Sequence, residues 1–232
     1  MILGGLQKLT LIDYPGRVAA TVFTFGCNFR CGFCHNYDLM GDQDEKVMPV
    51  REKEFFDFLD SRVGKLDGVC VTGGEPTLQG DLIGFIEKIK EKDFLVKLDT
   101  NGSNPEMLET LLKRGLVDYV AMDIKAPLQK YAAVAGLPGL DLEKIKNSVK
   151  LVKKAPEYEF RTTVVHGLHT KEDLLEIIDW LKGSRKYFLQ QYRAVNFPKN
   201  LCSKPLAPFP QKDLEEVLKE GEKNFEYCAL RQ

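Results

Sequence analysis

The sequence predicts an α/β fold, a partial (βα)6 TIM-like barrel in which parallel strands alternate with helices. Runs of about four to eight β-branched and apolar residues alternate with amphipathic segments of about ten to fifteen, as in repeated βα units. Right-handed crossovers would curl such units into an open barrel. The 232 residues, 44% of them hydrophobic, suffice for one core. We expect a single domain over 1–232, with the barrel at about 17–192 and a C-terminal loop and helix at 193–232.

The predicted strands are short apolar runs with the composition of buried strands. They cover 18–25, 68–72, 94–100, 116–125, 159–165 and 186–192. The predicted helices have apolar residues at helical spacing, and they cover 52–63, 81–92, 104–115, 141–155, 170–183 and 211–224. Three of these helices have a candidate N-cap, namely Asp81, Asn104 (followed by Pro105) and Thr170. Residues 196–210 carry four prolines and predict an irregular loop.

The charge balance gives no electrostatic reason to expect nucleic acid or an anionic membrane as a partner. The chain has 33 basic and 34 acidic residues, a formal net charge of −1. It has neither a signal-peptide pattern nor an apolar run of about 20 residues, so we expect a cytoplasmic protein. Disulfides are disfavoured there, so clustered cysteines indicate metal binding or catalysis.

The stretch FTFGCNFRCGFCHN holds three of the six cysteines, Cys27, Cys31 and Cys34, at spacing C-x3-C-x2-C. A structural zinc site takes four ligands, and His35 directly beside Cys34 would strain a tetrahedral site. Cys70 lies inside an apolar run and is expected in the core. Three thiolates on a [4Fe–4S] cluster leave one iron open. The spacing favours an iron–sulfur cluster, with zinc and unligated thiols as alternatives.

Polar segments follow the first four predicted strands. The cysteine loop follows the first, GGEP (73–76) the second, LDTNG (98–102) ends the third and MDIK (122–125) the fourth. Chemistry in parallel α/β sheets lies beyond the carboxyl ends of the strands. We therefore expect these four segments to form one site.

The cysteine spacing, with Phe33 just before the last cysteine, and GGEP together are identified as the signature of radical S-adenosylmethionine (SAM) enzymes. The resemblance runs from about Leu11 to Tyr192. LTLIDYPG before the first strand, CHN after the cysteines, LDTNG and MDIK further resemble the activating enzymes of glycyl radical enzymes. The resemblance is strongest to the activating proteins of anaerobic ribonucleotide reductase, and pyruvate formate-lyase activating enzyme is a near relative.

The resemblance implies that Cys27, Cys31 and Cys34 hold a [4Fe–4S] cluster whose fourth iron chelates the amino and carboxylate groups of SAM. One electron from the cluster would break a carbon–sulfur bond and give a 5′-deoxyadenosyl radical, which takes a hydrogen atom from a glycine of the partner enzyme. A reduced flavodoxin or ferredoxin is the implied electron donor.

The same resemblance assigns further residues to SAM. Glu75 would meet the ammonium group, Lys125 the carboxylate, and Phe33 the adenine. The full set of implied SAM contacts is Phe33, Gly73, Gly74, Glu75, Asp99, Asn101, Lys125 and Arg161. The alternatives are a plain turn for GGEP, a solvated lysine for Lys125, a structural ion pair for Arg161 and loop packing for Phe33.

Two aspartates at neighbouring strand ends would repel each other unless a cation neutralises them. The resemblance implies a monovalent cation held by Asp99, Thr100 and Asp123. Asp99 as a cap of the turn after it is an alternative role. Asp13 is implied to meet the backbone of the partner's glycyl loop, and a turn role is its alternative.

The chain departs from pyruvate formate-lyase activating enzyme near the sixth predicted strand, where it lacks a histidine and offers Gln191 or Arg193. His35 is expected to be structural. His166 and His169 are expected to be solvated, and Cys202 and Cys228 to be lone thiols. Two other functions stay open: a radical SAM enzyme acting on a small molecule or peptide, similar to deazaguanine synthases, and a zinc-binding interaction module.

Overall fold

The computed structural model describes residues 1–41, 48–193 and 205–231. The chain divides into two compact units, which we describe separately. Unit 1 comprises residues 1–28, 38–121 and 144–157, and unit 2 comprises 29–37, 122–143 and 158–232. The prediction of one domain over 1–232 stays a prediction.

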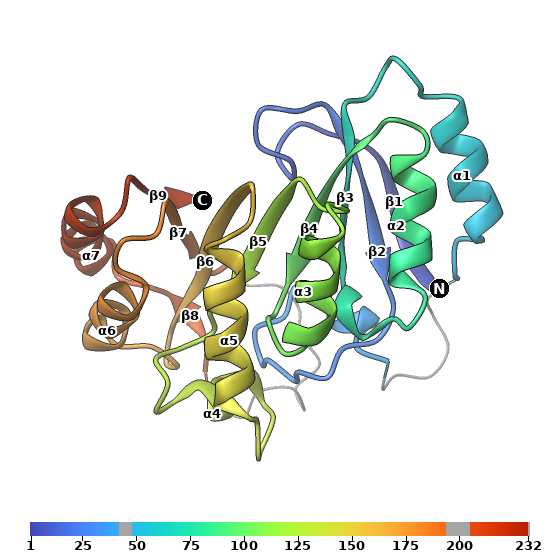
Figure 1. Ribbon diagram of the computed structural model, residues 1–232. Coiled ribbons are helices and arrows are strands. Elements are labelled where there is room, and N and C mark those ends of the chain that lie inside the picture. Colours follow the sequence, from blue (N-terminus) through green and yellow to red (C-terminus); the bar gives the residue numbers. More distant parts are fainter. Residues whose placement is uncertain (42–47, 194–204, 232) are drawn as a thin grey trace. The chain divides into compact units, whose positions relative to one another are not determined.

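The strands of unit 1 form a largely parallel sheet in the order β1-β2-β3-β4-β5 (Figure 1). They are β1 (Leu3–Thr10), β2 (Ala19–Thr24), β3 (Gly68–Gly73), β4 (Leu95–Thr100) and β5 (Tyr119–Asp123), which ends in unit 2. β2 pairs in parallel with β3, and β3 with β4, whereas β1 is antiparallel to β2. Thr24 lies opposite Gly73, so the loops after β2 and β3 leave the sheet at the same edge.

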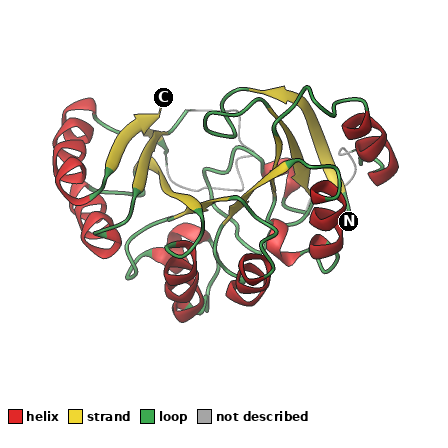
Figure 2. Cartoon of the chain, turned by 45° about the horizontal axis from the view of Figure 1, so that its top comes forward, coloured by secondary structure: helices red, strands yellow, loops and turns green. Residues whose placement is uncertain are grey.

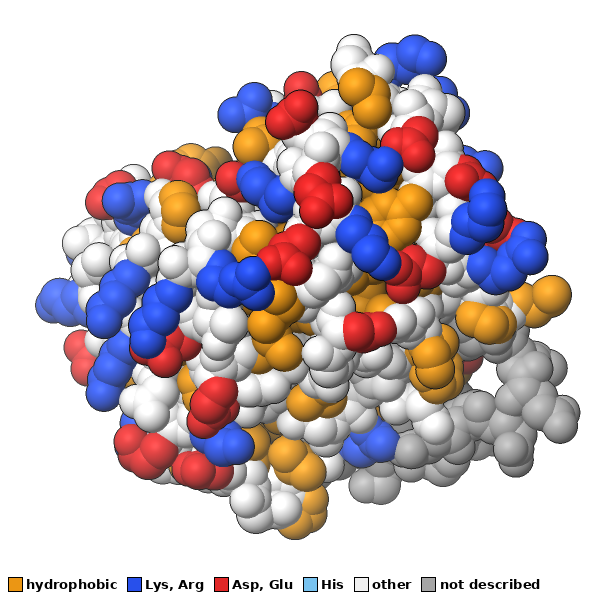
Figure 3. Space-filling model, turned by 45° about the vertical axis from the view of Figure 1, so that its right-hand side comes forward, with side chains coloured by type: hydrophobic (Ala, Val, Ile, Leu, Met, Phe, Trp, Pro, Cys, Tyr) orange, Lys and Arg blue, Asp and Glu red, His pale blue; other side chains and the backbone are white. Residues whose placement is uncertain are grey.

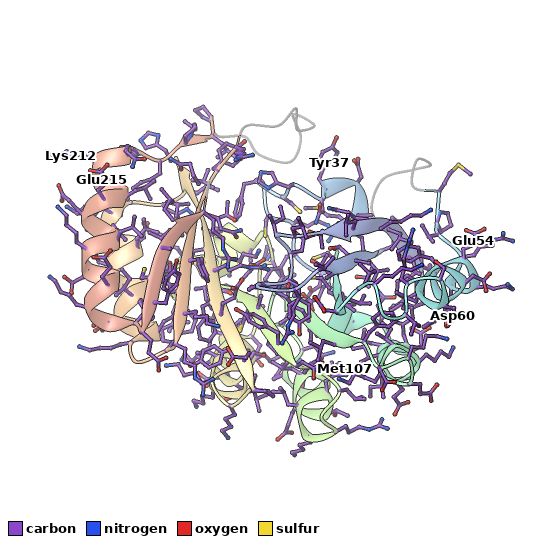
Figure 4. All side chains as sticks on the ribbon, turned by 90° about the horizontal axis from the view of Figure 1, so that it is seen from above. Tyr37, Glu54, Asp60, Met107, Lys212 and Glu215 are labelled. Carbon is purple, nitrogen blue, oxygen red and sulfur yellow. The ribbon has the colours of Figure 1, made fainter. Side chains whose placement is uncertain are left out.

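Helices α1 (Glu52–Asp60), α2 (Leu82–Lys90), α3 (Pro105–Lys113) and most of α5 (Leu142–Val152) belong to unit 1. Short 3-10 turns cover Tyr37–Leu39 and Pro76–Leu78. α1 is amphipathic: Phe55 and Leu59 are buried, whereas Glu54 and Asp60 point away from the strands (Figure 4). In Figure 2 the helices of each unit lie along one side of its strands.

The first residues of α3 and α2 show which predicted N-caps form side-chain hydrogen bonds. Asn104 caps α3 as predicted, because its side chain accepts a hydrogen bond from the Met107 amide at 3.3 Å and Pro105 is the first helical residue. Asp81 occupies the N-cap position of α2 as predicted, but it does not cap the helix with its side chain. Its carboxylate makes no cap hydrogen bond and instead pairs with the amino group of Met1.

Unit 2 has its own parallel strands in the order β6-β7-β9, with β8 antiparallel to β6. Their bounds are β6 (Glu157–His166), β7 (Lys186–Gln191), β8 (Ala207–Pro208) and β9 (Tyr227–Arg231). The helices are α4 (Tyr131–Ala135), α6 (Lys171–Leu181) and α7 (Gln211–Asn224). Thr170 caps α6 as predicted, in a reciprocal capping box with Asp173. On α7, Leu214 and Val217 are buried, and the exposed Lys212 and Glu215 are labelled in Figure 4.

Among the strands and α-helices of the described residues, four were not predicted: β1, α4, β8 and β9. β1 contains two adjacent glycines and three exposed residues, so it lacks the apolar run of a buried strand. β9 is short and forms by pairing with β7, a contact between segments far apart in sequence. Of the predicted loop at 196–210, residues up to 204 lie outside the described part, and β8 lies in the remainder.

The surface agrees with the charge balance of the sequence. Acidic and basic side chains are mingled over the face shown in Figure 3, with apolar side chains between them. In residues 1–41, 48–193 and 205–231, no helix is long and apolar enough to cross a membrane.

The C-terminal strand β9 is tied to β6 by a buried ion pair. The two terminal nitrogens of Arg231 donate to the two carboxylate oxygens of Glu159 at 2.7 and 2.8 Å. Glu159 is fully buried, and the Arg231 guanidinium also lies over the ring of Phe188, 3.4 Å from its centroid. The last strand therefore supplies the bidentate partner of this buried carboxylate.

We expect Arg231→Met to lower the free energy of unfolding by about 3 kcal/mol, because it leaves a buried carboxylate without its bidentate partner. Urea unfolding followed by circular dichroism measures this. Lys223→Met is the matched control, since it breaks the exposed pair with Glu220 and should cost far less stability than Arg231→Met. Equal losses in the two variants would contradict the assigned role of β9.

Candidate active site

The first cysteine follows β2 in a loop held by backbone hydrogen bonds within unit 1. The amide of Gly26 donates to the Leu39 carbonyl at 2.8 Å, and the Glu75 amide donates to the Gly26 carbonyl at 2.8 Å. The Asn101 side-chain amide lies 3.8 Å from the Cys27 sulfur. Segments after β2, β3 and β4 therefore meet at Cys27, as expected for these three loops.

The glycines of GGEP let two backbones touch. Gly73 has φ +115°, and a Cβ on it would lie 2.4 Å from the Thr24 nitrogen. A Cβ on Gly74 would lie 2.1 Å from the Gly26 carbonyl oxygen. The close approach that these glycines permit is therefore to the chain just before Cys27. Their predicted contact with SAM stays a prediction.

Glu75 is a buried carboxylate with four hydrogen bonds, and only 1% of its surface is exposed. Its Oε1 accepts from the Thr77 amide at 3.1 Å, the Thr77 hydroxyl at 2.5 Å and the Thr100 hydroxyl at 2.7 Å. Its Oε2 accepts from the Asn101 amide at 2.6 Å. Burial raises the pKa of Glu75, and these hydrogen bonds oppose that rise. Glu75 thus fixes the loop after β4 to the loop after β3.

Asn101 belongs to a set of side-chain hydrogen bonds around the cysteine loop. Its Nδ2 donates to Asn28 Oδ1 at 3.0 Å, and Asn28 Nδ2 donates to the Ser103 hydroxyl at 2.9 Å. Asn101 Oδ1 accepts from the Ser103 amide at 2.9 Å. The side chain predicted to contact SAM is therefore oriented by the residue that follows Cys27.

Asp99 faces a cation that sequence reasoning missed. Its carboxylate pairs with Lys97, two residues earlier on the same face of β4, and accepts from the Thr72 hydroxyl at 3.3 Å. The sequence LVKLDT contains the signal, because Lys and Asp at i and i+2 share one face of a strand. What the sequence does not show is that this face is buried.

The other two cysteines lie in unit 2 against α4. The Arg30 amide donates to the Ala135 carbonyl at 2.8 Å, and the Cys31 sulfur lies 3.8 Å from the same oxygen. The Cys34 amide donates to the Cys31 carbonyl at 3.1 Å. Burial raises the pKa of the Cys34 thiol, and the positive charge of Lys125 acts against that rise.

Asp123 lies between two cationic side chains of unit 2. Arg161 Nε donates to it at 2.8 Å, and Lys125 Nζ at 3.1 Å. Burial alone would raise the pKa of Asp123, but the charges of Arg161 and Lys125 outweigh burial and hold the pKa well below its ordinary value. Burial would also lower the pKa of Lys125, and the charge of Asp123 reverses this and raises it. Lys125 and Arg161 thus belong to one ion-pair cluster centred on Asp123.

The prediction that His169 is solvated is wrong. The ring is 4% exposed and packs edge-on against Phe33 with centroids 6.4 Å apart. Its Nδ1 accepts from the Val165 amide at 3.1 Å, so Nε2 carries the proton and donates to the Lys125 carbonyl at 2.8 Å. Burial lowers the pKa of His169. The buried neutral ring connects the backbone of Lys125 to the cysteine loop, because Phe33 lies between Cys31 and Cys34.

Asp13, half-buried at the end of LTLIDYPG, accepts from the Thr21 hydroxyl at 2.6 Å, and its amide donates to the Thr10 hydroxyl at 3.2 Å. Leu11 and Ile12 beside it are 68% and 84% exposed. A turn role is thus present. The predicted contact with a glycyl loop stays a prediction.

The remaining residues considered in the sequence have structural contacts or lie outside the cysteine motif. Gln191 exchanges two hydrogen bonds of 2.9 Å with the backbone of Phe209, so its amide holds the chain after β8. His35 lies 3.2 Å from the Arg193 carbonyl, in keeping with a structural role. Cys228 is half-buried on β9, and burial raises its pKa to about 12. Cys202 lies outside the described residues.

Within the described ranges, no group of three or more His, Cys, Asp or Glu side chains is placed to hold a metal ion. The assignment of Cys27, Cys31 and Cys34 as cluster ligands therefore rests on their spacing and chemistry, and it stays a prediction. The cation expected at Asp99, Thr100 and Asp123 also stays a prediction.

Residues 21–181 match the protein family described as the Radical SAM superfamily. A protein of Methanocaldococcus jannaschii named "Putative glycyl-radical enzyme activating enzyme" is 35% identical over 99% of this chain and 95% of its own length. The pyruvate formate-lyase-activating enzyme of Clostridium pasteurianum is 27% identical over 97% of each chain. Streptococcus suis SuiB, in a structure with S-adenosylmethionine bound, is similar with a TM-score of 0.62 and 15% identity over 89% of this chain and 48% of that one. The predicted α/β fold of the radical SAM type is confirmed.

We expect Gly74→Ala to lower the free energy of unfolding by about 1–3 kcal/mol, because the added methyl group would collide with the Gly26 carbonyl and push the cysteine loop away. Chemical denaturation measures the change. Gly84→Ala is the control, since Gly84 is an exposed position in α2 with open space around it, and alanine there should add about 0.5–1 kcal/mol. A neutral Gly74→Ala would contradict the packing role of GGEP.

His169 predicts a pH dependence of stability. Burial holds its pKa in the folded protein below the ordinary histidine value of about 6.5, so the unfolded chain binds more protons near that pH. The stability that the neutral ring contributes is complete above about pH 6.5 and is lost as the pH falls, by up to about 1.4 kcal/mol per pH unit. Urea unfolding between pH 5 and 7.5 should show a shallower slope for His169→Asn than for the wild type. His166→Asn, at an exposed ring, should keep the wild-type slope.

Proposed function

Because the chain belongs to the radical SAM superfamily and, within it, to the glycyl-radical enzyme activating enzymes, we propose that it activates an anaerobic ribonucleotide reductase by making a glycyl radical. Enzymes of this superfamily use a [4Fe–4S] cluster and SAM. The observation that carries the proposal is the joining of the cysteine loop to GGEP through Gly26, Gly74 and Glu75. The full-length likeness to a glycyl-radical enzyme activating enzyme supports the same class of substrate.

When bound, the reduced cluster and SAM would supply the one-electron radical chemistry that takes a hydrogen atom from the partner's glycine. The chain's own contribution is to bind, orient and exclude water. Cys27, Cys31 and Cys34 would hold the cluster. Thiols must lose their protons to bind iron, and the positive charge of Lys125 favours the Cys34 thiolate.

Glu75 would receive the ammonium group of SAM. Its Oε1 already accepts three hydrogen bonds, whereas in the described structure Oε2 accepts one, from the Asn101 amide. A carboxylate oxygen has two acceptor sites, so Oε2 keeps capacity for a charged donor. Asn101 and the two glycines of GGEP lie on the loops that Glu75 fixes, which supports their assignment to the same ligand.

Lys125 would meet the carboxylate of SAM. An ammonium group has three N–H donors, and one is directed to Asp123. Asp123, itself held by Arg161, keeps this lysine protonated and in place. Phe33, packed on His169, would contribute an apolar surface to the adenine.

Asp13 would bind the backbone of the partner's glycyl loop. Its Oδ2 accepts from Thr21, and a carboxylate carries further acceptor sites for backbone amides. The exposed Leu11 and Ile12 beside it offer apolar contact area that suits a protein substrate better than a small polar molecule. The electron would come from a reduced flavodoxin or ferredoxin, in the cytoplasm of an anaerobic cell.

The decisive experiment mixes the reconstituted, reduced protein with SAM and the host's anaerobic ribonucleotide reductase, without oxygen. We expect a glycyl-radical doublet in the EPR spectrum and 5′-deoxyadenosine in the same tube. Cys31→Ala should lose both signals together with the iron–sulfur absorbance, while its circular dichroism stays native. Cys228→Ala is the matched control and should keep all three, because Cys228 lies on β9 and outside the motif.

Three outcomes would contradict parts of the proposal. Deoxyadenosine without the doublet would overturn the reductase as target and leave the small-molecule or peptide alternative. A colourless, zinc-containing protein would overturn the enzyme assignment. A Cys31→Ala variant that still cleaves SAM would overturn the ligand assignment.

A further inference from the structure

Lys97 is a buried ammonium inside the sheet of unit 1. Its side chain is 1% exposed, and its Nζ pairs with Asp99. The same nitrogen lies 3.8 Å from the Cys70 sulfur on β3 and 5.8 Å from the centroid of the Tyr119 ring on β5. A buried lysine keeps its charge only with a partner of this kind. The ion pair with Asp99 is therefore an integral part of the core of unit 1.

Asp123 of unit 2 is also matched by the chain itself, through Arg161 and Lys125. Each aspartate that the family resemblance assigns to a monovalent cation thus already faces at least one cationic side chain. Thr100, the third assigned residue, would contribute a neutral backbone carbonyl, and its hydroxyl donates to Glu75 at 2.7 Å and accepts from the Gly102 amide at 3.1 Å. Neither the Asp99 nor the Asp123 carboxylate therefore carries the uncompensated negative charge that would attract a metal cation.

We propose that Lys97 supplies at Asp99 the positive charge that the family resemblance assigns to a monovalent cation, so that this enzyme binds SAM without a metal ion at Asp99, Thr100 and Asp123. The inference rests on the proposed function, since it concerns the same site. Lys97 acts through Asp99 and is a positioning residue. A cation at Asp99 would have to displace an ammonium that is enclosed by Cys70, Tyr119 and the strands around it.

The first test uses the wild-type, cluster-loaded protein. SAM affinity is measured by anaerobic equilibrium dialysis in chloride salts of Na+, K+ and tetramethylammonium at equal ionic strength. Tetramethylammonium is too large and too weakly coordinating to replace a small metal cation at a carboxylate. We expect the same Kd in all three salts to within about twofold. An affinity at least about tenfold tighter in Na+ or K+ would overturn the proposal.

The second test uses the apoprotein, so it depends on neither the cluster nor SAM. Lys97→Met keeps the length of the side chain and removes its charge, leaving Asp99 without its cation. We expect this variant to unfold at a lower temperature in tetramethylammonium than in Na+ or K+, because a small cation can now bind at Asp99. The wild type and Lys97→Arg should melt at one temperature in all three salts.

Lys90→Met is the matched control. It breaks another partly buried ion pair of unit 1, with Asp118 at 2.8 Å, away from the assigned residues. It should lose stability without gaining any dependence on the cation. A Lys97→Met protein that melts alike in all salts would overturn the proposal. If Lys97→Met does not fold, the wild-type salt comparison still decides.

The two tests separate the inference from the proposed function. Failure of the wild type to bind SAM in any salt would contradict the proposed function, and the apoprotein melting curves would still decide the role of Lys97. A cation-dependent Kd beside intact glycyl-radical formation would overturn the inference alone.

Discussion

The burial of Glu75 is the constraint on which the site in unit 1 depends. A carboxylate that is 1% exposed is tolerated only when hydrogen bonds replace its lost water. All four donors come from the turn after β3 and the end of β4. The backbone of Glu75 in turn bonds Gly26, next to Cys27. Hydrogen bonds therefore join the loops after three strands, and Cys27, which we propose as a cluster ligand, lies in a loop held by a residue that follows another strand.

In unit 2 the equivalent constraint is a row of alternating charges. Arg231 pairs with Glu159, Arg161 Nη1 lies 3.9 Å from Glu159 and Arg161 Nε pairs with Asp123, which also holds Lys125. Each charged side chain is compensated by its neighbours. Removing one of them would leave the next with an uncompensated charge, which lowers the stability of the fold. The C-terminal strand thereby supports a lysine assigned to SAM, although β9 lies far from MDIK in the sequence.

The regular helices and strands were predictable because their signals are local. Asn104 and Pro105 mark the start of α3, and α7 begins and ends where its apolar spacing predicts. β9 was not predictable, because its five residues become a strand only by pairing with β7. Burial of polar residues was missed for a similar reason. The local sequence does not show that His169 and Lys97 are buried, because side chains that pack on them, such as Phe33 and Tyr119, lie far away in the sequence.

GGEP shows how a ligand motif can also be a packing motif. Glycine is required at both positions because a Cβ there would lie 2.1–2.4 Å from atoms of a neighbouring backbone. One carboxylate oxygen of Glu75, Oε1, accepts hydrogen bonds from three protein donors. Because these hydrogen bonds hold Glu75 in one position, Oε2 would not have to move to accept a hydrogen bond from the ammonium group of SAM. Such preorganisation reduces the entropic cost of binding. The structural role of the motif and its assigned role toward SAM therefore support each other, because the contacts that fix the loops also orient the group that would bind.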